Sequence, residues 1–286
     1  MLRIFLFLAT NAAVMFILYL SMSIFGVERY IGDGNIVNLV IFASIIGFSG
    51  SFISLFMSKW VAKKTMGVHI ITPNNIENEN EEWFYYTVKR LSEKAGIGMP
   101  EVGHYHGEAN AFATGWNRNN SLVAVSDGLF NSMTYEEIEA VIGHEIAHIA
   151  NGDMVTSTLL QGVLNTFVIV LARLIGTAID RVLLKNENGN GIAYHITVFI
   201  LEIVLTILAS IIIMWFSRYR EYRADEGAAK LVSKDSMIDA LKRLGNISTE
   251  PLPDKMVSMG ISGGKIANLF STHPSLDNRI KNLEKF

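Results

Sequence analysis

The stretch Val141–Asn151, which reads VIGHEIAHIAN, decides how the rest of this chain is interpreted. It contains His144-Glu145-Ile-Ala-His148, and side chains four residues apart lie on the same face of an α-helix. The two imidazoles can therefore bind one metal ion. Glu145 lies about 100° around the helix from His144, where its carboxylate can take a proton from a water molecule at that ion. The pattern predicts a zinc site with Glu145 as the general base.

The residues on either side of this motif predict a well-defined helix. Thr134 and Glu137 fit a capping box, in which each side chain accepts a hydrogen bond from the other residue's backbone N–H. Asn151-Gly152 is typical of a helix C-terminus. An apolar stripe at helical spacing lies between these ends: Ile138, Val141, Ile142, Ile146 and Ile149. The alternative is an amphipathic helix that carries two histidines by chance, and the ordered setting favours the metal site.

The composition indicates a membrane protein. Of 286 residues, 50% are hydrophobic and 18% are charged, with a mean hydropathy of +0.31, whereas a soluble domain is nearer a quarter charged. The chain has no cysteine, so a zinc ion would have to be bound by histidine and carboxylate side chains. The net charge of −3 and the pI near 6.2 give no reason to expect nucleic acid as a partner.

Four apolar segments are candidates for membrane-spanning helices. Ile4–Phe25 and Ile36–Met57 each have 22 residues without a charged side chain, which is long enough to cross a bilayer. Val155–Ile179 and Ile196–Phe216 are weaker candidates because each contains a charged residue, which is costly inside a membrane.

Two features of these segments predict how they pack. Arg173 and Glu202 would lie at similar depth in a hairpin of the last two segments, and we expect either an ion pair between them or separate extension to the membrane surface. The second segment has small residues at four-residue spacing that let another helix approach closely: Gly47, Gly50, Ser51 and Ser54.

Lysine and arginine are enriched on one side of the predicted topology. Seven flank that side and three the other: Arg3, Lys59, Lys63, Lys64, Arg218, Arg220 and Arg223, against Arg29, Arg181 and Lys185. The positive-inside rule makes the first side cytoplasmic. We therefore expect two membrane helices in residues 1–57, a membrane hairpin in 154–216, and a cytosolic domain built from 58–153 and 217–286.

The cytosolic segments predict an α+β domain that is mainly helical. Short strands at Pro100–Tyr105, Ala109–Ala113 and Ser121–Ser126 indicate a small antiparallel sheet, with an asparagine-rich turn between the last two. Helices are expected at Glu81–Lys94, which Gly96 closes, and at Ser217–Leu231, Ser233–Gly245 and Ser275–Lys285.

A catalytic zinc ion usually has three protein ligands and one open position. Glu221 and Asp225 lie four residues apart and so share a helix face. One carboxylate can bind the ion while the other hydrogen-bonds a ligand histidine. The alternative is an exposed helix of alternating charge, but the spacing downstream of the histidine motif favours the metal site.

Several further motifs resemble those of one family. The histidine motif with a downstream Glu-x-x-x-Asp helix is similar to the gluzincin metalloproteases. The resemblance is narrowed by Asn110–Gly115 (NAFATG), Ser217–Asp225 (SRYREYRAD), Thr272-His273-Pro274, Leu2–Met15 and the four apolar segments. With these motifs the chain resembles, over essentially its whole length, the HtpX family of membrane heat-shock proteases, which are relatives of the CAAX prenyl proteases.

The resemblance implies a membrane-embedded zincin fold of the gluzincin type and a set of site residues. One zinc ion per subunit would be bound by His144, His148 and Glu221. Glu145 would be the general base, and Asp225 would hydrogen-bond a ligand histidine.

Other residues acquire roles from the same resemblance. Asn110, Ala111, Phe112 and Ala113 would form an edge strand to which a substrate peptide adds, although Phe112 could simply pack in the core.

Near the C-terminus, the resemblance implies that His273 donates a hydrogen bond to the developing oxyanion, and that Arg279 anchors Asp225 or the cleft. From the sequence alone, His273 could equally be a cap or a packing residue. His104 and His106 could form a second metal pair on one strand face, but we expect surface histidines there.

We therefore predict a multi-pass zinc metalloendopeptidase of the cytoplasmic (inner) membrane with its active site facing the cytoplasm. By resemblance, its substrates are damaged or misfolded membrane proteins, and it acts in quality control during the stress response. Expected partners are the lipid bilayer, polypeptide substrates and other quality-control proteases of the membrane, but not nucleic acid.

Two alternatives remain open. A prenyl-peptide processing protease would carry more membrane helices around a large chamber. A non-enzymatic membrane scaffold with structural zinc would need four protein ligands and would leave Glu145 without a role.

Overall fold

The computed structural model describes residues 36–183, 191–247 and 273–286. The chain divides into two compact units, the first formed by Met1–Ser54 with Ser157–Ile213 and the second by Leu55–Thr156 with Met214–Phe286.

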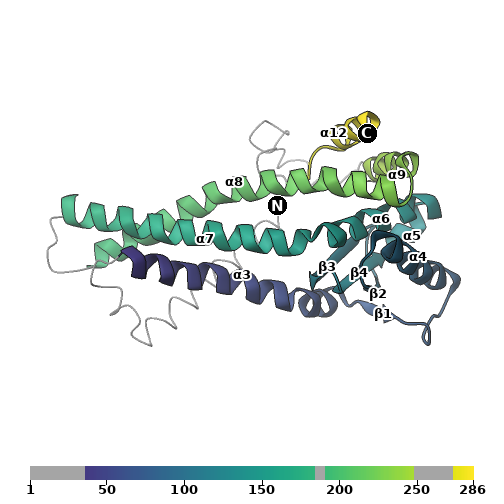
Figure 1. Ribbon diagram of the computed structural model, residues 1–286, viewed down its shortest axis with the longest axis horizontal. Coiled ribbons are helices and arrows are strands. Elements are labelled where there is room, and N and C mark those ends of the chain that lie inside the picture. Colours follow the sequence, from purple (N-terminus) through teal and green to yellow (C-terminus); the bar gives the residue numbers. More distant parts are fainter. Residues whose placement is uncertain (1–35, 184–190, 248–272) are drawn as a thin grey trace, which may run out of the picture. The chain divides into compact units, whose positions relative to one another are not determined.

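The described part of the first unit consists mainly of stretches of three long helices, whose remaining residues belong to the second unit (Figure 1): α3, Ile36–Met66; α7, Asp153–Ala178; and α8, Ile192–Leu231. A short π-helical turn at Ile179–Leu183 follows α7. All three helices are long and apolar enough to cross a membrane, with mean hydropathies of 2.2, 1.9 and 2.8 in their most apolar windows. Long apolar helices cover the three later predicted segments, and the predicted span at Ile4–Phe25 lies outside the described residues.

Small residues let α3 and α7 approach closely. A Cβ atom on Gly47 would lie 2.6 Å from Oγ1 of Thr166. A Cβ atom on Gly162 would collide with the ring of Phe48. Nδ2 of Asn165 donates a hydrogen bond to the carbonyl oxygen of Gly47 at 3.4 Å. The close helix approach predicted at Gly47 is confirmed.

Within the described residues, Arg173 of α7 and Glu202 of α8 do not form an ion pair, which was one of the two arrangements expected for them. The guanidinium carbon of Arg173 instead lies 4.6 Å from the ring centre of Phe42 on α3. A cation over an aromatic face is stabilised by the ring's negative potential. This contact gives Arg173 a partner within its own unit that does not require Glu202.

The second unit contains a four-stranded mixed sheet. Its strands are β1, His69–Ile71; β2, Glu101–Tyr105; β3, Ala111–Asn117; and β4, Asn120–Ser126, in the order β1-β2-β4-β3. β2 and β4 are parallel, with Tyr105 opposite Ser126 at their ends, and the other two pairings are antiparallel. β3 therefore lies at one edge of the sheet.

The wholly antiparallel sheet predicted from the sequence is wrong at its centre. β3 and β4 form the expected hairpin. However, β4 lies between β2 and β3, so the chain crosses past the position of β4 before it turns back. β2 consequently runs in the same direction as β4. Alternating apolar residues indicate which face of a strand is buried, but they do not indicate which strand lies beside it.

Helices pack on this sheet and on one another (Figure 1). They are α4, Glu79–Ala95; α5, Asp127–Ser132; α6, Tyr135–Asn151; α9, Lys234–Ile247; and α12, Leu276–Lys285, together with the last part of α8. α4 and α6 contact the sheet and each other, α9 packs on α6, and α12 packs on α9. The helices expected in these segments are confirmed, and Gly96 ends α4 in the left-handed region at a φ of 68°.

One apolar core joins the sheet to its helices. Side chains without exposed surface include Phe84 and Leu91 of α4, Val123 and Val125 of β4, and Ile142 of α6. Burial of one such side chain stabilises the fold by about 1.5–3 kcal/mol. Because these residues lock α6 against the sheet, they also fix the position of the histidine motif.

Candidate metal centre

Helix α6 carries the histidine motif, and both of its ends are fixed. Oγ1 of Thr134 accepts a hydrogen bond from the N–H of Glu137 at 3.3 Å, and Oε2 of Glu137 accepts one from the N–H of Thr134 at 2.8 Å. The predicted capping box is therefore confirmed. Gly152 ends the helix at a φ of 71°, in the left-handed region that favours glycine. The motif thus lies in a helix with a defined start and stop.

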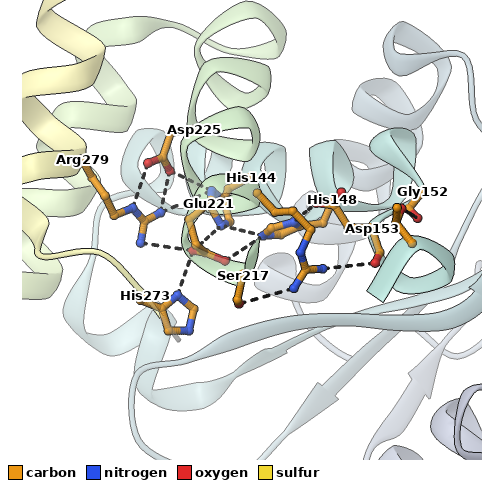
Figure 2. A network of polar contacts seen from close by, with 11 residues as sticks. His144, His148, Gly152, Asp153, Ser217, Glu221, Asp225, His273 and Arg279 are labelled. Carbon is orange, nitrogen blue, oxygen red and sulfur yellow. Dashed lines mark hydrogen bonds and ion pairs between the residues drawn. The ribbon is translucent and has the colours of Figure 1, made fainter. Parts of the chain in front are cut away.

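The two histidines of the motif point toward Glu221 of α8 (Figure 2). Nε2 of His144 lies 3.1 Å from Nε2 of His148. Oε1 of Glu221 lies 3.4 Å from Nε2 of His148, and its Oε2 lies 3.6 Å from Nε2 of His144. One ligand atom from each residue lies within 4.8 Å of the other two. Three ligand atoms this close can surround a single metal ion.

The chemistry of these side chains fits a divalent metal ion. His144 and Glu221 are 7% and 4% exposed. Oε2 of Glu221 is buried and has ionic neighbours, but no hydrogen-bond donor in good geometry among the described residues. Two imidazole nitrogens and one carboxylate form a known ligand set of catalytic zinc sites, which keep a fourth position open. Glu145 is more exposed than its neighbour His144, and the centre does not need it as a ligand.

A second carboxylate lies behind His144. Oδ1 of Asp225 lies 2.9 Å from Nδ1 of His144, and Asp225 has no exposed surface. Arg279 of α12 donates two hydrogen bonds to Asp225, from Nε to Oδ2 at 2.8 Å and from Nη2 to Oδ1 at 2.5 Å. Its Nη1 lies 3.6 Å from Oε2 of Glu221. The structure thus brings the predicted residues Asp225 and Arg279 together on the far side of His144 (Figure 2).

His148 has a corresponding carboxylate that the sequence pattern did not reveal. Oδ2 of Asp153 lies 2.6 Å from Nδ1 of His148, and Asp153 is 4% exposed. Nη1 of Arg220 donates a hydrogen bond to the carbonyl oxygen of Asp153 at 3.1 Å. The only signal was an aspartate directly after Gly152, where a left-handed glycine turns the chain back toward the last helical turn.

These carboxylates favour protonated histidines in the metal-free centre. Burial alone would lower the pKa of His144, but the neighbouring carboxylates of Asp225 and Glu221 raise it above its usual value. Burial also opposes the charge on His148, yet hydrogen bonds to Asp153 and Glu221 raise its pKa to about 10. A metal ion and protons therefore compete for the same imidazole nitrogens.

His273 reaches the centre from the residues that precede α12. Its Nδ1 lies 2.8 Å from Oε2 of Glu221, and 61% of its side chain is exposed. Figure 2 shows the ring beside Glu221, a candidate ligand. Most of its surface is open to solvent. An imidazole in this position can donate a hydrogen bond to a group that enters from solvent.

The predicted substrate strand coincides with the edge of the sheet. Ala111, Phe112 and Ala113 lie in β3, directly after Asn110. Within the described sheet β3 pairs only with β4, and it packs against α6, which carries the histidine motif. Phe112 is half-buried, with its ring centre 5.6 Å from that of Tyr105. Phe112 therefore packs against Tyr105 and also lies in the edge strand, so the two expectations for this residue are compatible.

Comparison with protein families and curated proteins gives matches over nearly the whole chain. Residues 78–286 match peptidase family M48. The protease HtpX homolog of Thiobacillus denitrificans is 56% identical over 285 residues, with 97% of each chain covered. Protease HtpX of Pseudoalteromonas atlantica is 53% identical over 291 residues, with 100% of each chain covered.

Among solved structures, the crystal structure of S. mikatae Ste24p matches with a TM-score of 0.61 and 18% sequence identity. The match covers 99% of this chain and 67% of that chain. At this identity the likeness concerns the fold alone.

Proposed function

Because this chain belongs to peptidase family M48 and is a membrane metalloprotease, we propose that it is a zinc-dependent endopeptidase of the cytoplasmic membrane. Its substrates would be damaged or misfolded membrane proteins and their cytosolic segments. The observation that carries this proposal is the convergence of His144, His148 and Glu221 beside Glu145.

The proposed chemistry assigns separate roles to the ligands and to the base. His144, His148 and Glu221 would hold a zinc ion, which when bound supplies the Lewis acidity that makes water a nucleophile near neutral pH. Glu145 would accept the proton of that water and pass it to the leaving amine. Glu145 neighbours the first ligand yet lies about 100° around the helix, which supports a role in proton transfer and not in metal binding.

The buried carboxylates would keep the ligands in their binding orientation. Asp225 and Asp153 each contact Nδ1 of one histidine. A hydrogen bond from Nδ1–H to a carboxylate fixes the tautomer in which Nε2 has a free lone pair. Arg279 would hold Asp225 in place through its two hydrogen bonds. Asp225 and Arg279 are therefore positioning residues in this proposal.

Substrate binding would use the edge of the sheet. A peptide in extended conformation would pair with the outward-facing backbone groups of β3 at Ala111–Ala113, which gives affinity with little sequence preference. Asn110, directly before β3, would position this strand, because its N–H and its carbonyl are both bonded to Ser126. His273 would donate a hydrogen bond to the oxyanion that forms at the scissile carbonyl. The exposed ring of His273 beside Glu221 supports this role.

The proposed orientation rests on charge. Seven lysine or arginine residues flank the apolar segments on one side and three on the other, which favours a cytoplasmic active site. The cytoplasmic side also holds the cytosolic segments of misassembled membrane proteins, so enzyme and substrate would meet there. Other quality-control proteases of the same membrane are proposed partners.

Casein cleavage by the full-length enzyme in detergent tests the proposed function. The enzyme would be stripped with a chelator and supplied again with Zn²⁺. We expect cleavage to return with zinc, and Glu145→Gln to lower it by about 10²–10⁴-fold while binding as much zinc as the wild type. His144→Ala should lose both zinc and cleavage.

Unchanged cleavage by Glu145→Gln would contradict the mechanism. If the wild type binds zinc but cleaves no unfolded protein, a dedicated processing enzyme would replace general proteolysis as the preferred function.

A further inference from the structure

A second group of metal-ligating side chains shares no residue with the centre described above. His104 lies in β2, His106 follows the last residue of β2, and Asp127 follows the last residue of β4. β2 and β4 are parallel, with Tyr105 opposite Ser126. The carboxyl ends of two neighbouring parallel strands lie side by side, so these three side chains come together at the ends of the two central strands.

The carboxylate of Asp127 contacts both rings. Its Oδ1 contacts Nε2 of His104, and its Oδ2 contacts Nδ1 of His106. The ring centres lie 5.5 Å apart with their planes at 80°. One ligand atom from each residue lies within 4.8 Å of the other two. The side chain of His104 is 20% exposed and that of His106 is 90% exposed, so an ion can enter directly from solvent.

A buried carboxylate lies behind His104. Oε1 of Glu81 lies 3.8 Å from Nδ1 of His104, and Glu81 is 5% exposed. Its other oxygen, Oε2, accepts a hydrogen bond from the N–H of Glu77 at 3.0 Å, which fixes the carboxylate in place. At 3.8 Å this carboxylate is too far from Nδ1 to form a hydrogen bond, but its buried negative charge favours a cation beside His104.

We propose that His104, His106 and Asp127 bind a divalent transition metal ion such as Zn²⁺. Two imidazole nitrogens with one carboxylate oxygen suit zinc and its neighbours in the first transition row, whereas calcium and magnesium prefer oxygen ligands alone. The site is open and has one carboxylate behind its histidines where the main centre has two. It therefore binds the ion more weakly than the main centre and exchanges it with solvent.

An ion at this site would fix the loop that leads into β3. The loop Gly107–Asn110 is already attached to the residues around Asp127. The N–H of Gly128 donates to the carbonyl oxygen of Gly107 at 3.1 Å, and Oγ of Ser126 donates to the carbonyl oxygen of Glu108 at 2.7 Å. A metal ion bound by both His106 and Asp127 would add a further link between this loop and the residues around Asp127. The loop ends directly before the edge strand β3.

Zinc stoichiometry tests the second site without any measurement of cleavage. The full-length protein would carry Glu145→Gln, which prevents self-cleavage, and no histidine tag. Bound Zn²⁺ would be counted by elemental analysis at buffered free Zn²⁺. We expect two ions per chain in this background, one after His106→Ala, and two after His69→Ala, the matched control. His69 is also exposed and lies opposite His104 in the sheet, but does not belong to the cluster.

The outcomes separate this site from the main one. His148→Ala should retain one ion, and adding His106→Ala should remove it. Zn²⁺ should also slow amide hydrogen exchange at Gly107–Asn110, and His106→Ala should abolish that slowing. Saturation at one ion per chain in the parent protein would overturn the proposal. Two ions in His106→Ala, or loss of one in His69→Ala, would overturn this ligand set. Because cleavage is never measured, failure here would leave the proposed protease function untouched.

Discussion

Two clusters of histidines with a carboxylate lie in the second unit, and their surroundings differ. In the main centre, His144 and Glu221 are 7% and 4% exposed, and each histidine has a buried carboxylate on its second nitrogen. In the cluster of His104, His106 and Asp127 at the strand ends, the His106 side chain is 90% exposed. Within the described contacts only His104 has a further carboxylate, that of Glu81, near its second nitrogen.

This difference separates a rigid, buried site from an open, exchangeable one. Similar ligand atoms converge in both, within 4.8 Å. What distinguishes them is the second layer of partners, which fixes ring orientation and tautomer in advance. The main centre therefore contains buried charged side chains whose hydrogen bonds and ion pairs come partly from the surrounding protein and would come partly from a bound metal ion. The following predictions test that distinction.

The largest effect on stability is expected where a buried charge loses its partner. Arg279→Met removes both hydrogen bonds to Asp225, which has no exposed surface. Breaking a buried pair in this way costs about 3–5 kcal/mol of unfolding free energy. Chemical denaturation of the detergent-solubilised enzyme measures the loss.

A matched control for Arg279 is available on the surface. Arg90 pairs with Glu139 at 2.8 Å, and 55% of its side chain is exposed. Arg90→Met should cost at most about 1 kcal/mol. Equal losses in the two variants would mean that burial does not strengthen the pair around the main centre.

A smaller effect is expected for metal affinity when the carboxylate behind His148 is neutralised. Asp153→Asn keeps the shape of the side chain but weakens the hydrogen bond to Nδ1. Loss of such a partner typically lowers metal affinity about 10–100-fold. Competition with a coloured chelator gives the Kd for zinc. Asp127→Asn is the control and should leave the affinity of the main centre unchanged. An unchanged Kd in Asp153→Asn would show that His148 needs no orienting carboxylate.

The pH dependence of zinc stabilisation follows from the raised pKa of His148. In the metal-free protein this pKa is about 10, against an ordinary value of 6.5. The charged imidazole therefore contributes stability that is fully present below pH 6.5 and is lost as pH rises toward 10. The zinc-bound centre uses neutral imidazoles and has no such loss. The gain in unfolding free energy on zinc binding should therefore grow with pH.

Thermal unfolding with and without zinc, at several values between pH 6.5 and 10, measures this gain. The rise should be about 1.4 kcal/mol per pH unit for each proton displaced. In Asp153→Asn the rise should begin to level off at lower pH, because the pKa of His148 falls. A gain that stays constant with pH would contradict the proposed competition between protons and metal.

The two clusters also differ in how far the sequence predicts them. The main centre depends on spacings within single helices, four residues between His144 and His148 and four between Glu221 and Asp225. Helical periodicity fixes which side chains share a face, and caps at Thr134 and Gly152 define one of those helices. The pairing of the two helices was inferred from the need of a catalytic zinc ion for a third ligand, and the resemblance to a family then assigned Glu221 as that ligand.

The cluster at the ends of β2 and β4 depends instead on strand order. Asp127 meets His104 and His106 only because β4 lies parallel to β2, and this pairing was the part of the sheet predicted wrongly. Asp153 was missed for a related reason, because its contact with His148 depends on the direction in which the chain leaves Gly152. Local pattern predicts faces and ends of elements, whereas neighbours across the fold depend on packing of the whole domain.

The smallest effect is expected from His106→Ala on the stability of the zinc-free protein. Its ion pair with Asp127 lies at the surface, where such pairs contribute about 0–1 kcal/mol. In His148→Ala, by contrast, the buried carboxylates of Asp153 and Glu221 both lose a charged neighbour. Zinc-free His106→Ala should therefore unfold at nearly the wild-type denaturant concentration, and His148→Ala at a clearly different one. If His106→Ala changed stability as much as His148→Ala, the exposed cluster would be a structural part of the fold and not an open site that a metal ion can enter and leave.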